Sequence, residues 1–66
     1  MWTLIYGGAP VQKYSDLEAV EEHQVQIDNL IKQGGGWFHL SYPKGDGIAV
    51  SRFWISASIP IAFVDE

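Results

Sequence analysis

Hydrophobic and aromatic residues gather in four short clusters along this chain, and the longest stretch between clusters has a different, helical pattern. Large apolar residues alternate with or adjoin β-branched ones inside the clusters, which is typical of strands. The clusters cover residues 2–6, 37–42, 48–55 and 59–64. We therefore predict four strands, and we interpret residues 9–14 as a loop or irregular extended connection because they contain Pro10.

One amphipathic helix is predicted to begin at Ser15. The segment from Ser15 to Glu18 matches a capping box, in which the two side chains accept each other's backbone amides. Gly34–Gly36 supplies the left-handed backbone conformation that ends a helix. Winding the segment at about 100° per residue gives one apolar stripe, with His23 and Leu30 along its edge. The stripe consists of Leu17, Val20, Gln24, Ile27 and Ile31.

The order of elements is a strand, a helix and then a meander of three strands. Asp46-Gly47 is a strong hairpin signal between the second and third strands. Pro60 has no amide to donate, so the last strand should begin beside it or lie at an edge. We predict a single α+β domain over residues 1–66, with one helix packed on a mostly antiparallel four-stranded sheet in the order β-α-β-β-β. The first strand could pair with the third or fourth strand, or across a dimer.

Large side chains occupy both faces of the second and third strands, although one helix covers only one face of a sheet. Trp37 and Phe38 lie on opposite faces of their strand, and leaving both exposed would forfeit several kcal/mol at about 25 cal/mol per Å². We therefore predict that the helix-free face is an interface, with a symmetric homodimer favoured and a host or structural protein as the other class of partner. The interface candidates are Trp37, His39, Arg52 and Trp54.

The charge balance argues against nucleic acid as the partner. Four basic residues face eight acidic ones, and the formal net charge is -4. Nucleic-acid binders normally carry a basic stripe, and stacking platforms for single strands are interleaved with Arg and Lys, whereas only Arg52 lies inside an aromatic strand here. A small nucleic-acid-binding regulator that uses the aromatic sheet face is the alternative to an interaction module.

No catalytic, metal or cofactor site is predicted. The chain has no cysteine, which excludes thiolate chemistry and disulfides. His23 and His39 have no carboxylates at metal-ligand spacing, and the acidic residues at the helix start are explained by the helix dipole. The glycine runs match no phosphate-binding pattern. We find neither a run of about 20 apolar residues nor a signal-peptide pattern, so we expect a non-enzymatic cytoplasmic protein that does not enter a membrane.

Two terminal segments resemble small uncharacterised proteins of actinobacteria and their phages. Residues 4–7 form a strand that closes on Tyr-Gly, and residues 52–63 form a Trp-containing strand followed by an Ile-Pro strand. Trp2 departs from the glycine expected at that position. The resemblance implies an actinobacterial or phage origin, and it brings no catalytic residues with it.

Overall fold

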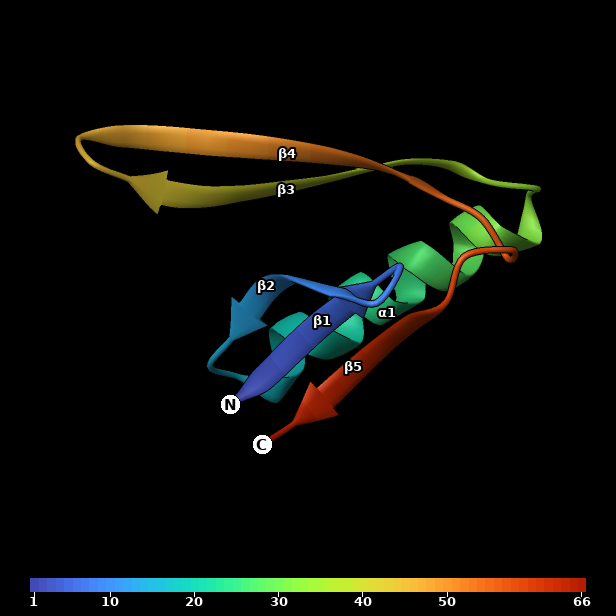
Figure 1. The fold of residues 1–66 in the computed structure, drawn as a ribbon, viewed down its shortest axis with the longest axis horizontal. Helices are drawn as coiled ribbons and strands as arrows, with labels where there is room; N and C mark the ends of the chain where they lie inside the picture. The colour runs from blue at the N-terminus through green and yellow to red at the C-terminus, as the bar shows by residue number, and fades with distance from the viewer.

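The computed structural model describes residues 1–66 and contains one helix and five strands, arranged in two antiparallel sheets (Figure 1). The α+β class is confirmed, but the expected single four-stranded sheet is wrong because the strands divide into a group of three and a group of two. In chain order the elements are β1 (Trp2–Tyr6), β2 (Ala9–Tyr14), α1 (Leu17–Lys32), β3 (Gly36–Lys44), β4 (Gly47–Ile55) and β5 (Ile61–Asp65).

Residues 9–14, predicted as a loop or irregular extended connection, are strand β2, which forms a hairpin with β1. Gly7 and Gly8 make the two-residue turn with φ of 61° and 86°, and positive φ at both positions is characteristic of a type I′ turn. The strand tolerates Pro10 because β2 lies at the edge of its sheet, next to a bulge. The bulge leaves Val11 without an opposite residue.

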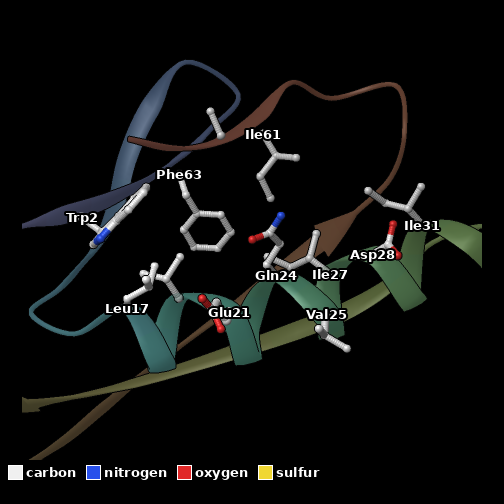
Figure 2. A pocket seen from close by; sticks show the side chains of 12 residues that line it. Trp2, Leu17, Glu21, Gln24, Val25, Ile27, Asp28, Ile31, Ile61 and Phe63 are labelled. Atoms are coloured by element: carbon white, nitrogen blue, oxygen red, sulfur yellow. The ribbon is translucent and has the colours of Figure 1, made fainter. Parts of the chain in front are cut away.

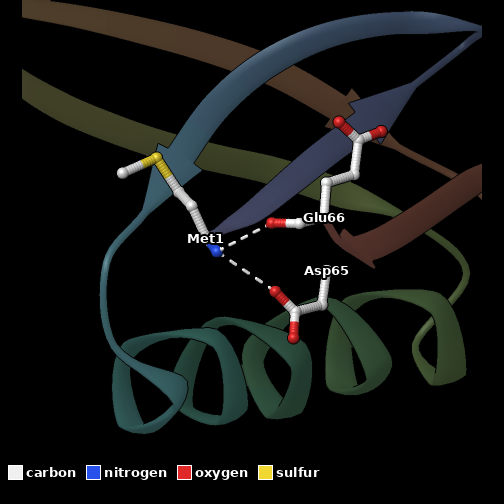
Figure 3. A network of polar contacts seen from close by, with 3 residues as sticks. All are labelled: Met1, Asp65 and Glu66. Carbon is white, nitrogen blue, oxygen red and sulfur yellow. Dashed lines mark hydrogen bonds and ion pairs between the residues drawn. The ribbon is translucent and has the colours of Figure 1, made fainter.

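Strand β1 lies in the centre of the three-stranded sheet, in the order β2-β1-β5. Of the pairings left open by the sequence, the one with the last strand is present, in antiparallel register from Trp2↔Asp65 to Tyr6↔Ile61. Beyond this register, the terminal ammonium of Met1 lies 3.2 Å from a carboxylate oxygen of Asp65 and 3.2 Å from the carbonyl oxygen of Glu66 (Figure 3). Strand β5 begins directly after Pro60, as predicted.

Strands β3 and β4 form a separate long hairpin that projects beyond the end of the helix (Figure 1). The hairpin is predicted correctly, although its turn consists of Gly45 and Asp46, one residue earlier than the Asp46-Gly47 signal. Gly45 has φ of 58° and Asp46 has negative φ, as in a type II′ turn. The predicted meander of three strands is wrong, because β4 does not pair with β5.

Helix α1 begins one residue later than the capping box implied. Asp16 is the N-cap, and its carboxylate accepts the amide of Ala19 at 2.9 Å. Ser15 instead forms the bend between β2 and the helix. The glycine stop is confirmed, because Gly34 and Gly35 adopt φ of 98° and 117° and the Gly35 amide donates to the carbonyl of Leu30 at 2.8 Å.

The core lies where the hairpin, the helix and the three-stranded sheet meet. Only seven of the 66 residues are buried, so the domain has little apolar burial with which to offset chain entropy. The buried residues are Leu4, Tyr14, Val20, Ile27, Phe38, Leu40 and Ile55.

The buried face of α1 is rotated from the predicted stripe. Val20 and Ile27 are buried as expected, but Leu17 and Gln24 are exposed. His23, predicted at the edge of the stripe, is half-buried, with its ring 5.2 Å from that of Phe38 between centroids. The helix packs against the inner face of β3, so its buried side faces Phe38. Leu17 consequently lies on the side of the helix that faces β5.

Candidate interface on the outer face of the hairpin

The four interface candidates come together as two adjacent cross-strand pairs. In the β3–β4 register Trp37 lies opposite Trp54, and His39 lies opposite Arg52. All four side chains are exposed, on the face of the hairpin opposite to the buried Phe38 and Leu40. We call this surface the outer face; it consists of Trp37, His39, Ser41, Pro43, Ile48, Val50, Arg52 and Trp54.

The outer face carries large apolar side chains at its base and near its tip, with His39 and Arg52 between them. Trp37 is 61 % exposed and Trp54 48 %, while Ile48 and Val50 nearer the tip are 75 % and 58 % exposed. These four residues alone present several hundred Å² of apolar surface, which is as large as the biggest patch on a typical monomer.

The two tryptophans have defined positions. Their rings pack edge to face, with centroids 5.5 Å apart and an angle of 80° between the ring planes. The ring of Trp54 also lies close over Gly35, where a Cβ atom would approach the ring to 3.2 Å. The backbone at the helix stop therefore lies against the Trp54 ring, and the aromatic pair sits at the base of the hairpin.

Arg52 is the only residue of the outer face with a formal charge. It forms no ion pair in the structure; the two ion pairs present join the Met1 ammonium to Asp65 and Lys32 to Asp28. A guanidinium beside tryptophan is a common anchor in protein interfaces, because it can stack on aromatic rings and donate hydrogen bonds.

The histidines lie on opposite sides of the hairpin. His39 projects from the outer face, whereas His23 packs on Phe38 at the inner face. Nδ1 of His23 is 2.8 Å from the hydroxyl of Tyr14. Burial lowers the pKa of His23, against an opposing effect of Glu22, and burial raises the pKa of Tyr14 to about 12. The His23–Tyr14 pair is therefore half-buried and hydrogen-bonded.

No group of three or more potential His, Asp or Glu ligands lies close enough to hold a metal ion. The only helix is too short and too polar to cross a bilayer.

A second apolar surface was missed from the sequence. An open groove of about 910 Å³ runs between α1 and β5, and Figure 2 shows Ile61 and Phe63 pointing across it toward the helix. The sequence pattern contained this surface, because Leu17, Gln24 and Ile31 share a predicted stripe that lines the groove, with Leu17 and Gln24 exposed and Ile31 partly buried against the core. Nine of the 12 lining residues are hydrophobic, so the groove is a candidate binding surface in its own right.

The comparisons with known proteins identify no relative. The chain matches no protein-family model, no curated protein and no solved structure.

Proposed function

We propose that this chain is a non-enzymatic interaction module that self-associates through the outer face of the β3–β4 hairpin. The observation that carries the proposal is the side-by-side exposure of Trp37 and Trp54 beside the unpaired Arg52. Aromatic and arginine side chains clustered at the centre of a patch are the usual anchors of protein interfaces.

The energetic support comes from the small core. With only seven buried residues, the monomer has few apolar contacts to stabilise it. Covering the exposed parts of Trp37, Trp54, Ile48 and Val50 would stabilise an assembly by several kcal/mol at about 25 cal/mol per Å², before the cost of association. This amount is comparable with the whole stability of a small domain.

The shape of the hairpin favours a two-fold dimer. The outer face is a continuous strip along two strands, so two copies can stack face to face with the same residues contributed by each. In that arrangement Arg52 of one copy can lie on a tryptophan of the other, away from the acidic residues of the helix. A host or structural protein partner would use the same strip, and an actinobacterial or phage origin stays a prediction of the terminal resemblance.

The mass of the protein in solution tests self-association. We expect a monomer–dimer equilibrium in the micromolar range by analytical ultracentrifugation, because the outer face has only eight residues, against about 20–30 residues per partner in a standard interface. Val50→Lys should weaken dimerisation at least about tenfold, since it places a charge inside the apolar strip without touching the core.

Val25→Lys is the matched control. Val25 is 60 % exposed, like Val50, but it lies on α1 beside the groove. A strict monomer at the highest soluble concentration, or a dimer that Val25→Lys disrupts and Val50→Lys does not, would remove the basis for the proposed interface.

Nucleic-acid binding through the same strip is the competing function. The paired tryptophans and Arg52 could stack on unpaired bases, but the net charge of -4 opposes phosphate binding. Fluorescence titration with single-stranded DNA and RNA at low salt separates the two functions. Quenching that disappears as salt rises, and that Trp37→Thr abolishes, would favour the regulator over the dimerisation module.

A further inference from the structure

The groove between α1 and β5 combines an apolar floor with a free strand edge. Strand β5 pairs with β1 on one side only, and no strand lies on its other side (Figure 1). The side chains of Ile61 and Phe63 point from this strand into the groove, opposite Ile27 and Ile31 of the helix (Figure 2). The groove therefore borders backbone as well as side chains.

The register shows which backbone groups of β5 are free. Met1 and Glu66 exchange backbone hydrogen bonds, and the Gly7 amide donates to the Pro60 carbonyl at 2.9 Å. Because such pairs alternate along an antiparallel ladder, the amides and carbonyls of Ala62 and Val64 face β1. Those of Ile61 and Phe63 face outward and are available to an added strand.

The polar residues of the groove are acidic or neutral. Glu21, Gln24 and Asp28 are the only polar residues that line it, and all three belong to α1. Glu21 and Asp28 are seven residues apart in the helix, which corresponds to about 10 Å along its axis. Two cations pair with acidic residues here: Lys32 with Asp28 at 2.9 Å, and the Met1 ammonium with Asp65 at 3.2 Å.

We propose that the groove binds an extended peptide segment that adds to the free edge of β5, with apolar residues facing the groove and lysine or arginine residues facing Glu21 and Asp28. Strand addition supplies hydrogen bonds to Ile61 and Phe63, and alternate side chains of the peptide enter the groove. The two carboxylates on the helix side of the groove favour peptide segments that contain lysine or arginine.

A second copy of the chain is a poorer occupant of the groove. Its own β5 has no basic residue, ends at Asp65 and is followed by Glu66. Pairing two β5 strands would place these carboxylates and two sets of groove acids in one assembly. The peptide site is separate from the outer face of the hairpin, so it does not depend on the proposed dimer.

A synthetic peptide tests the groove directly. The probe is a capped seven-residue peptide, threonine-lysine-threonine-isoleucine-threonine-lysine-threonine, whose lysines and isoleucine fall on one face of a strand. The matched peptide has glutamate in place of both lysines. Binding is followed at pH 7.5 by amide chemical shifts and amide hydrogen exchange.

We expect the lysine peptide to bind at least about fivefold more tightly than the glutamate peptide and to slow exchange of the Ile61 and Phe63 amides. The double variant Glu21→Gln, Asp28→Asn should lose most of this preference. Glu22→Gln removes the same kind of charge from the same helix outside the groove, and it should leave binding unchanged.

Three outcomes overturn the proposal. They are absence of binding at millimolar peptide, equal binding of both peptides, and protection of hairpin amides in place of Ile61 and Phe63. Protection of these two amides on concentrating the protein alone would instead make the groove an interface between copies of the chain.

Discussion

At the residue scale, the His23–Tyr14 hydrogen bond is a polar contact at the edge of the core, and breaking it should lower the stability of the fold. The hydroxyl of Tyr14 and Nδ1 of His23 are 2.8 Å apart, between the rings of Phe38 and Phe63. In this position Nδ1 of neutral His23 can accept a hydrogen bond from the Tyr14 hydroxyl. Protonated His23 has no acceptor nitrogen, and its positive charge would also be partly desolvated.

The lowered pKa of His23 makes stability depend on pH. Since burial disfavours the protonated imidazole, the unfolded chain binds a proton more readily than the folded one. The contribution of His23 is complete above the unfolded pKa of about 6.5 and decreases as pH falls toward the lower folded pKa. We expect the free energy of unfolding, measured with urea in dilute protein, to fall between pH 7 and pH 5.5.

Two histidine variants locate the source of this slope. His23→Gln should flatten the pH dependence in that range, whereas His39→Gln should retain it because His39 is exposed on the outer face. An unchanged slope in His23→Gln would assign the pH dependence to other groups.

At the element scale, the strand–helix boundary illustrates how neighbouring signals compete. Ser15 and Asp16 are both good N-caps, and the capping-box pattern favours Ser15. In the fold β2 continues to Tyr14, whose buried ring is anchored in the core, so Ser15 is used in the bend and Asp16 becomes the cap. Which residue becomes the N-cap therefore depends on where β2 ends, and the residues around the cap do not determine that.

Removing the observed cap should destabilise the protein more than removing the expected one. We expect Asp16→Ala to lower the free energy of unfolding by about 1 kcal/mol, because the Ala19 amide loses its acceptor. Ser15→Ala should cost less than about 0.5 kcal/mol, since Ser15 makes no hydrogen bond through its side chain. Urea unfolding of both variants measures the difference; the reverse order would restore Ser15 as the cap.

Strand β2 is the one strand that was not predicted from the sequence. Pro10 and the Gly7-Gly8 pair suggested a break, yet two glycines are also a hairpin turn, and proline is compatible with an edge strand beside a bulge. Whether a strand is at an edge is a property of the sheet. Gly7, Gly8 and Pro10 are therefore compatible with either a loop or a hairpin with an edge strand, and the position of the strand in the sheet decides between them.

At the scale of the whole molecule, the hairpin is anchored at its base and free at its tip. Phe38, Leu40 and Ile55 are buried, whereas no residue of Tyr42–Val50 is. The tip projects past the helix in Figure 1. At the tip, β3 and β4 are therefore held together mainly by backbone hydrogen bonds, because few side chains there pack against the rest of the domain.

Hydrogen exchange should report this gradient. In dilute protein we expect the hydrogen-bonded amides of the tip to exchange through local opening, faster than those beside Phe38 and Leu40. At concentrations where the outer face is covered in a dimer, exchange at the tip should slow. Uniform protection along the hairpin in dilute protein would mean that the tip opens only with the whole domain.

The sequence by itself determined the helix, the presence of β1, β3, β4 and β5, and the alternation that places Trp37, His39, Arg52 and Trp54 on one side. The bounds differ, since β5 covers Ile61–Asp65 where residues 59–64 were predicted. These features depend on local periodicity, turn residues and caps, which are properties of neighbouring residues. Only the tertiary structure decided that the strands divide between two sheets, that α1 rotates toward the hairpin, and that β5 is left with an open edge beside an acidic groove. Those outcomes depend on which surfaces pack together in three dimensions, and an apolar side chain can be buried by several alternative neighbours with similar energy.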